Sequence, residues 1–462
     1  MPNSLFQYEM LPTTWFYVSG LMLLATFFRF NRFWSVRNLD ILGLILFSPG
    51  LLYISTSVTR DDPINSMGYL WLMGAGCYFF LRLMLDPFMV RRPLLEPNLS
   101  SSGVTFACVT LLAFLVANVI VNRGPNMETA RTLRLEQILT FQENHQGPEH
   151  RKQGNVPGYP PFLKLTEETN QIFLPEAKLW EDVLIAKKVA PSQTLNTLEL
   201  SFLQEDQESA NSLPETKGRL SGEDLFLFFL VLLIQTLIVL TLVLIGHCHF
   251  GNIKTGVAAA MFYLLLPYAS QITGALDHIV PALLLLLAVL LYRRPMLSGI
   301  MLGMAGSLVF YPFFLIPLWA SFYWQRGLFR FLLGTFSAIM GMMIFLLTSP
   351  ETLGTSAEQV SLMFGHYSMR VVSPDGFWHF CPTIYRIPII TLFGVICFGL
   401  LIWPTRKTLA TLISCSALLM LGVQFWMGNQ GGLYMAWYLP LLILTVFRPN
   451  LDDRVASGTV VQ

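Results

Sequence analysis

Charged residues are scarce in this sequence. Aspartate, glutamate, lysine and arginine make up 12% of the 462 residues, the formal net charge is +1, and 54% of the residues are hydrophobic. Proteins that bind nucleic acid or another polyanion usually carry an excess of basic residues, so we expect no nucleic-acid partner. The mean hydropathy of +0.56 instead indicates a polytopic membrane protein.

Several catalytic motifs are also absent. The chain contains no P-loop, Rossmann glycine pattern, nucleophile elbow or HExxH pair, which disfavours ATP-driven and hydrolase functions. The six cysteines are scattered, and four of them fall inside apolar runs, so no disulfide framework is expected. His247, Cys248 and His249 have metal-ligand side chains, but without a partner cluster their spacing is weak support, and we predict no metal site.

Apolar runs of membrane-spanning length dominate what is present. Since a membrane helix needs about 20 apolar residues, we expect an all-α transmembrane bundle of about 13 segments, including a short helical hairpin. It divides into N-terminal transmembrane helices (1–122), a polar, partly helical insertion outside the membrane (123–222), and a C-terminal transmembrane bundle (223–462). An alternative interpretation treats the insertion as a poorly ordered spacer. The expected spans lie near residues 13–29, 38–58, 67–86, 102–122, 224–246, 255–270, 278–292, 328–348, 387–403, 408–427 and 432–447, with the hairpin at 296–324.

Basic residues fall on every second connection between these runs, whereas the alternate connections at 271–278 and 428–432 carry none. Arginine and lysine mark the cytoplasmic side of a membrane protein. We therefore expect an integral protein of the plasma (inner) membrane, with its N-terminus outside and its C-terminus in the cytoplasm. The N-terminal apolar run lacks a basic n-region and is expected to remain as a helix. The basic connections carry Arg29, Arg32, Arg37, Arg91, Arg92, Lys254, Arg293, Arg294, Arg326, Arg406, Lys407 and Arg448.

The stretch from residue 296 to residue 324 is apolar and has basic residues at both ends, so both ends are expected on the same side. Roughly 30 residues is too long for one span and too short for two. Tyr311 and Pro312 lie at its middle, where the proline removes a helix hydrogen bond. We expect two short arms reaching about 20 Å into the bilayer. Broken backbone cannot face lipid, so a protein-lined or wet cavity should lie above the apex, with Asp277 and His278 at its mouth.

Acidic residues at the outer ends of spans are candidates for chemistry. Asp61 and Asp62, Asp277 and Asp375 each take such a position. A carboxylate that faces a cavity can act as a general base or hold a divalent metal. A solvated loop acid is the alternative, and it is least favoured for Asp277, which directly abuts an apolar run. Asp40 opens the second span from the inside and is expected to be a helix N-cap.

The outer connection 350–386 is rich in rings and hydrogen-bonding side chains. Aromatic rings can stack on the apolar faces of sugars while polar groups bind the hydroxyls, so this loop suits a sugar or a lipid head group. The alternative is the aromatic belt found at any membrane interface. The relevant residues are His366, Tyr367, Arg370, Asp375, Trp378, His379 and Tyr385.

The order of features from residue 277 onward resembles the polytopic GT-C glycosyltransferases. An acid is followed by an apolar run, two arginines, the small-residue segment SGIMLGMAGSL, then FYPFFLIPLWA and a basic exit. The C-terminal GGLYMAWYLPLLILTVFRP is similar to the last span of the same group. The likeness is greatest to the polyprenol-phosphate-mannose type, which has a Tyr-Pro hairpin.

The resemblance implies transfer of a sugar, with inversion, from a polyprenyl-phosphate donor to an acceptor on the outer face. It makes Asp61 or Asp62 the catalytic base. Family members often carry a basic residue where this chain has Val309, so Arg60, Arg370 or Arg386 would have to bind the donor phosphate. Divalent-metal dependence varies within the group, so a divalent cation is an open cofactor. The substrate-binding candidates are Arg60, Asp277, His278, Tyr311, His366, Arg370, Asp375 and His379.

Membrane lipids and the lipid-linked sugar donor are the expected partners, and the sequence does not identify a protein partner. Two other functions stay open. A transporter or flippase of lipid-linked substrates would use broken helices as a substrate path. A non-catalytic membrane scaffold would use the 123–222 region to bind a partner.

Overall fold

The computed structural model describes residues 12–56, 63–89, 95–121, 222–269, 276–348, 360, 363–364, 377–427, 435–451 and 454–456. All regular elements within these residues are helical, so the all-α prediction is confirmed for them. Two compact units are distinguished: Met1–Phe162 with Val231–Gln462, and Leu163–Leu230. The described part of the second unit is the start of helix α9, and the predicted insertion 123–222 otherwise lies outside the described residues. The other described helices belong to the first unit.

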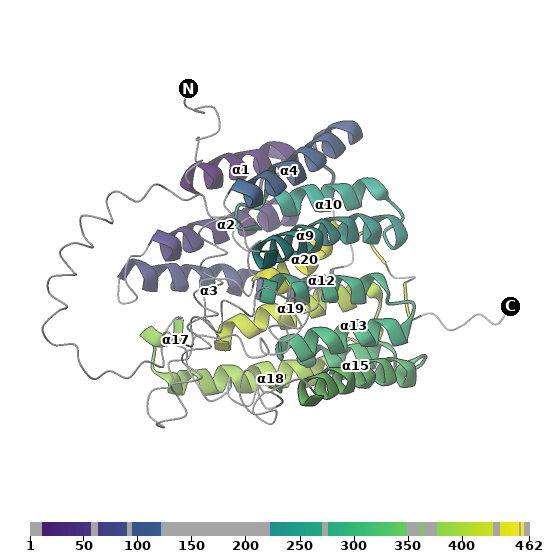
Figure 1. Ribbon diagram of the computed structural model, residues 1–462. Coiled ribbons are helices and arrows are strands. Elements are labelled where there is room, and N and C mark those ends of the chain that lie inside the picture. Colours follow the sequence, from purple (N-terminus) through teal and green to yellow (C-terminus); the bar gives the residue numbers. More distant parts are fainter. Residues whose placement is uncertain are drawn as a thin grey trace, which may run out of the picture. The chain divides into compact units, whose positions relative to one another are not determined.

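The helices coincide with the predicted apolar runs (Figure 1). Five of the described helices, α2, α3, α9, α15 and α19, are long and apolar enough to cross a membrane. The total number of segments and their placement in a bilayer stay predictions. The α-helices are α1 (Pro12–Phe27), α2 (Val36–Thr56), α3 (Pro63–Met84), α4 (Ser101–Val121), α9 (Gly222–Cys248), α10 (Ile253–Leu265), α12 (Leu276–Leu290), α13 (Pro295–Leu308), α14 (Ile316–Phe322), α15 (Leu328–Thr348), α17 (Phe377–Phe380), α18 (Arg386–Ile402), α19 (Leu409–Met427) and α20 (Met435–Phe447), and the short 3-10 turns are η1 (Phe30–Arg32), η2 (Asp86–Phe88), η5 (Tyr311–Leu315) and η6 (Thr383–Tyr385).

The expectation that Asp40 caps the second span was wrong. Helix α2 begins at Val36, and the Ser35 hydroxyl accepts a hydrogen bond from the backbone N–H of Asn38 at 3.3 Å. Serine is a preferred N-cap residue, so it takes the role assigned to the aspartate. Asp40 lies inside the helix and is buried, with its carboxylate bound by Arg82 and Tyr78.

Several described connections that carry basic residues contact one another, and we call the end of the first unit where they lie the basic end. The backbone N–H of Asn98 donates to the carbonyl of Thr26 at 2.7 Å, which joins the connection before α4 to the end of α1. The backbone N–H of Leu409 donates to the carbonyl of Arg454 at 2.7 Å, which joins the start of α19 to the segment after α20. Which side of a membrane each connection faces stays a prediction.

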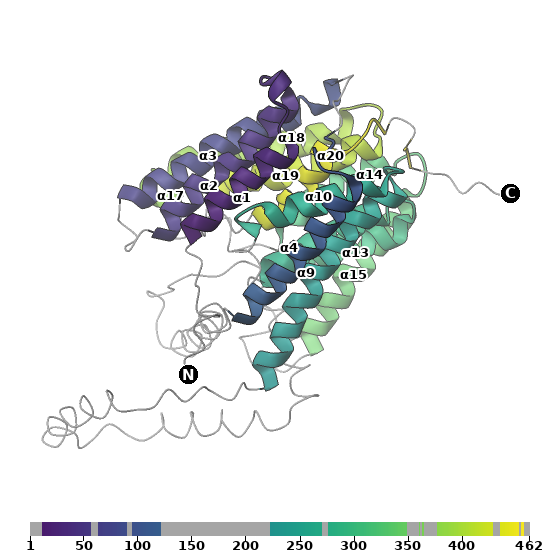
Figure 2. The same cartoon turned by 90° about the horizontal axis from the view of Figure 1, so that it is seen from above.

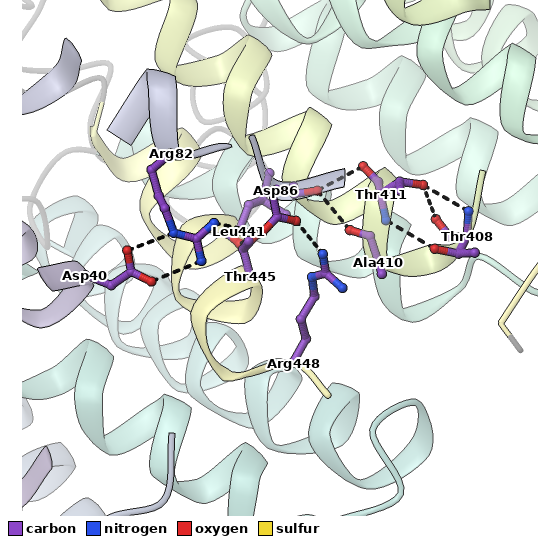
Figure 3. Close-up of polar contacts among 10 residues, drawn as sticks. Asp40, Arg82, Asp86, Thr408, Ala410, Thr411, Leu441, Thr445 and Arg448 are labelled. Atoms are coloured by element: carbon purple, nitrogen blue, oxygen red, sulfur yellow. Dashed lines mark hydrogen bonds and ion pairs between the residues drawn. The ribbon is translucent and has the colours of Figure 1, made fainter. Parts of the chain in front are cut away.

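The buried side chains of Asp40, Asp86 and Arg448 and the partly buried side chain of Arg82 form a charge chain at the basic end (Figure 3). Arg82 binds Asp40 through Nε and Nη2, at 3.1 and 3.2 Å, and binds Asp86 through Nη1 at 2.9 Å. The second oxygen of Asp86 accepts a hydrogen bond from Arg448, which follows α20. Positive and negative charges therefore alternate, and they tie α2, α3 and the end of α20 together.

Four helices that are flanked by basic residues at this end are short. As described, α10, α12, α13 and α20 have 13, 15, 14 and 13 residues. At 1.5 Å per residue they rise about 20 to 23 Å, less than the roughly 30 Å of a hydrocarbon core. By contrast, α2, α3 and α15 have 21, 22 and 21 residues. Because α12 packs against α13 and α20, and α10 packs against α20, the short helices are neighbours.

The chain between α12 and α15 forms the expected hairpin. Helix α13 ends at Leu308, the backbone turns, and η5 begins at Tyr311 with Pro312 in its first turn. After α14 the hydroxyl of Tyr323 donates to the carbonyl of Tyr292, so the second arm returns to the start of the first. The break and the return are both as the sequence predicts.

Glycines allow the first arm of this hairpin to contact α15 closely, and the two helices lie side by side in Figures 1 and 2. A Cβ atom at Gly299 would lie 2.2 Å from the carbonyl oxygen of Phe331, and one at Gly334 would lie 2.2 Å from that of Met296. Both distances are below any tolerable contact. Close backbone approach through small residues is the usual way in which membrane helices pack.

Candidate functional site

Four aromatic side chains meet where the short helices end away from the basic end. His278 comes from the first turn of α12 and Tyr311 from the apex of the hairpin, while Trp426 ends α19 and Trp437 begins α20. All four are buried. We call them the aromatic cluster. They are far apart in sequence and are brought together by the packing of α12, η5, α19 and α20.

Trp437 is the centre of the cluster. Its ring lies between His278 and Tyr311, with centroid distances of 5.2 Å to each. Tyr311 also meets Trp426 edge to face at 5.8 Å. Such ring pairs stabilise their arrangement beyond the burial of apolar area, so the hairpin apex has a well-defined position.

A buried arginine lies beside the cluster. Arg386 begins α18, and its Nε donates to the carbonyl of Trp426 at 2.6 Å. Its guanidinium carbon lies 5.8 Å from the centroid of the Trp426 ring, and its Nη2 is 3.1 Å from the sulfur of Met427. The site therefore combines a cation with several aromatic faces. The Nε1 group of Trp426 is buried and has no hydrogen-bond partner among the residues that the structure describes.

Polar pairs support the cluster from the adjacent helix turns. The hydroxyl of Tyr438 donates to Oε1 of Gln424 at 2.8 Å, which links the residue after Trp437 to α19. The hydroxyl of Tyr268 donates to the carbonyl of Leu44 at 3.2 Å. These buried bonds hold the surrounding helices in register, because a buried polar group that lost its partner would cost free energy.

Of the predicted site residues, the structure brings His278 and Tyr311 together through Trp437. Asp277 lies in α12 and His379 lies in α17, but the positions of their side chains are not described. Arg386, one of the three arginines predicted to bind the donor phosphate, lies beside the cluster. The remaining predicted site residues lie outside the described residues, so their roles stay predictions. These are Arg60, Asp61, Asp62, His366, Arg370 and Asp375.

Sequence reasoning did not select Trp426 and Trp437 as site residues. Both lie at the edges of apolar runs that flank the uncharged connection 428–432, which is the signal that could have identified them. The charge chain was missed as well. Arg82 and Asp86 stand at i,i+4 spacing at the end of an apolar run, where charges are rare and usually paired.

His249, one of the three weak metal-ligand candidates, has a structural role. Its Nε2 lies 2.8 Å from the carbonyl of Leu290 and must donate, because a carbonyl only accepts. Burial lowers the pKa of His249, which favours the neutral ring. The part of the chain that the structure describes contains no group of three or more His, Cys, Asp or Glu side chains that could hold a metal ion.

Comparisons with known proteins were negative: no family model, no curated protein and no solved structure matches the chain. The resemblance to GT-C glycosyltransferases therefore depends on two stretches of sequence, the one from residue 277 through the hairpin and the one around the last span. The structure adds the geometry of the hairpin apex, which lies in the first of these stretches, and of Trp437, which lies in the second.

Proposed function

We propose that this chain is an integral membrane glycosyltransferase that moves a sugar from a polyprenyl-phosphate donor to an acceptor on the outer face of the membrane. In this proposal the basic end faces the cytoplasm of a cell whose plasma (inner) membrane holds the protein. The observation that carries it is the meeting of the hairpin apex with His278, Trp426 and Trp437 at the ends of short helices.

The short helices favour a substrate cavity on the outer side. A helix that rises about 20 Å from the cytoplasmic face stops roughly 10 Å before the far side of the hydrocarbon core. Longer neighbours such as α2, α3 and α15 would form the walls of the space above. A donor with a long lipid chain needs such a site, because its head group must leave water while its tail stays in the bilayer.

Arg386 is suited to the donor phosphate. A guanidinium next to the departing phosphate would offset the negative charge that develops there as the sugar leaves. The indole N–H of Trp426, which lies beside the arginine, is a further donor for a phosphate or sugar oxygen.

The acceptor hydroxyl would be activated by a carboxylate. Asp61 or Asp62 would take its proton as the acceptor oxygen attacks the anomeric carbon. The bond between that carbon and the phosphate oxygen would break on the opposite side. The products would be an inverted glycoside and a polyprenyl phosphate.

A transfer assay tests this proposal. The protein in lipid nanodiscs is given radiolabelled polyprenyl-phosphate mannose or glucose and a membrane extract as the acceptor source. Loss of a general base costs about 100-fold or more, so we expect Asp61→Ala or Asp62→Ala to abolish product while the melting temperature is kept. A transporter would instead move labelled lipid across the bilayer without forming product. Unchanged product from both variants and from their double variant would contradict the catalytic assignment.

A further inference from the structure

The turn between α1 and α2, which contains η1, exposes an unusual set of side chains. Residues 29–34 are all exposed, and Phe30, Phe33 and Trp34 are 75%, 51% and 81% accessible. The rings form a row in the order Phe30, Phe28, Phe33 and Trp34, with centroid distances between neighbours of 5.0, 5.4 and 5.5 Å, and Phe28 is buried. The three exposed rings therefore belong to one ring cluster, in which the buried Phe28 joins Phe30 to Phe33 and Trp34.

The shape of this turn is fixed by one buried amide. Oδ1 of Asn38 accepts a hydrogen bond from the backbone N–H of Arg29 at 3.1 Å. Nδ2 of Asn38 lies 2.8, 3.0 and 3.3 Å from the carbonyls of Arg29, Arg32 and Phe33. Because these bonds hold the backbone on both sides of η1, the rings stay exposed in a preorganised arrangement. A surface whose order is already established loses little entropy on binding.

The charge of the surface is positive. Arg29 and Arg32 are exposed at the edges of the ring row, and Arg29 has one weak partner, Glu96, at 3.6 Å between two exposed side chains. An exposed ion pair is weak in water, so Glu96 offsets little of the positive charge of Arg29. The turn also lies at the basic end, next to the connection that precedes α4.

We propose that residues 29–34 form a binding surface for anionic phospholipid head groups of the inner leaflet. Phe30, Phe33 and Trp34 lie at the boundary between head groups and acyl chains, where amphipathic rings are favoured. Arg29 and Arg32 pair with lipid phosphates, whose negative charge complements the positive charge of the turn. This surface depends on the proposed membrane placement and is independent of sugar transfer.

Depth-dependent quenching tests where Trp34 lies. Wild-type protein and Trp34→Phe are compared in nanodiscs that contain lipids brominated near the head group or deep in the acyl chain, and the difference isolates the signal of Trp34. We expect quenching by the shallow bromines to exceed quenching by the deep ones. Trp71, which is 39% exposed on α3, serves as a reference through Trp71→Phe. Quenching of Trp34 by aqueous acrylamide but by neither bromolipid would overturn the proposal and favour a soluble protein partner.

Lipid selectivity tests the charge. The ratio of bound spin-labelled phosphatidylglycerol to phosphatidylcholine is measured by electron paramagnetic resonance for wild type, Arg29→Gln with Arg32→Gln, and Lys254→Gln. A basic residue near an anionic surface is worth about fivefold in affinity, so the ratio for the sites at this turn should fall markedly in the double variant. Lys254 is exposed at the same end and is the matched control, for which we expect a smaller change. Equal ratios in all three proteins would contradict the lipid assignment, whatever the outcome of the transfer assay.

Discussion

The two ends of the first unit are stabilised in different ways. At the basic end, buried charges are paired with one another, and Asp86 is bound by two arginines from opposite sides. At the other end, His278, Tyr311, Trp426 and Trp437 meet mainly through ring contacts beside a single buried arginine. A buried pair of charges specifies one arrangement, because each charge needs its partner. The basic end therefore fixes the fold, and the aromatic end is where the proposed substrate site lies.

Helix α20 connects these two ends. Trp437 lies in its first turn, and Arg448 directly follows its last residue. Because Trp437 and Arg448 are joined by one helix of 13 residues, the contact between Arg448 and Asp86 also helps to position Trp437 against Tyr311. Damage to the charge chain should therefore change the aromatic cluster, while damage to the cluster should leave the charge chain intact.

The largest effect is expected for Asp86→Asn. This change keeps the size of the side chain but removes the negative charge that Arg82 and Arg448 both bind, and breaking a buried ion pair costs about 3 to 5 kcal/mol. Thermal unfolding in detergent, followed by circular dichroism, measures the loss. The double variant Asp86→Leu with Arg448→Met removes both charges and should be more stable than Asp86→Asn. A loss below about 1 kcal/mol for Asp86→Asn would show that the charge chain does not fix the fold.

Gly299→Val should have the next largest effect. The new side chain would meet the backbone of α15 at the carbonyl of Phe331, and such overpacking costs about 1 to 3 kcal/mol. Gly341→Ala on α15 is the control, because an added Cβ at Gly341 meets nothing within 4 Å. Both are compared by their melting temperatures. Equal melting temperatures would mean that α13 and α15 are not in close contact.

Two buried tryptophans separate stability from function at the aromatic end. Trp319→Phe removes an indole that donates to Oγ of Ser416 at 3.1 Å, whereas Trp426→Phe removes no such bond within the described residues. The melting temperature should therefore fall further for Trp319→Phe, by the equivalent of about 1 kcal/mol. Sugar transfer should fall for Trp426→Phe only. A larger fall in melting temperature for Trp426→Phe than for Trp319→Phe, or a fall in sugar transfer for Trp319→Phe only, would contradict the placement of Trp426 in the proposed site.

A small pH effect is expected at the basic end, from His249. Burial lowers the pKa of its ring, so the unfolded chain binds more protons below the ordinary value of 6.5. The stability of the folded protein should then be unaffected above pH 6.5 and should fall as the pH drops through the window between 6.5 and the lowered pKa. Melting temperatures at pH 7.5 and 5.5 measure the change. His249→Gln should reduce the difference between the melting temperatures at the two pH values. If the difference stays the same in this variant, the pH dependence comes from another group.

The positions of the helices could be predicted from the sequence because the helices coincide with apolar runs, and charged residues mark where many of these runs end. Residues 328–348 were expected to form one span and do form α15. The hairpin was predictable because Pro312 stands between two basic ends. Asp40 was misassigned because Ser35, which lies outside the apolar run, provides the cap.

The contacts between distant residues could not be predicted. Arg448 and Asp86 are 362 positions apart, and no local sequence pattern indicates which buried charges pair with each other. The same holds for the placement of Trp437 between His278 and Tyr311, which depends on how α12, η5 and α20 pack. The sequence therefore identified two members of the cluster and missed the ring that joins them.

Equilibrium binding of tritiated polyprenyl-phosphate mannose to the protein in nanodiscs tests the role of the aromatic end most directly. We expect saturable binding that free polyprenyl phosphate competes for, reduced about tenfold or more in Arg386→Gln, since hydrogen bonds to charged groups contribute about 1.5 to 3 kcal/mol. Binding by Trp319→Phe should equal that of wild type once the folded fraction is matched. Absence of saturable binding, or equal affinity in wild type and Arg386→Gln, would contradict a donor site at the aromatic cluster.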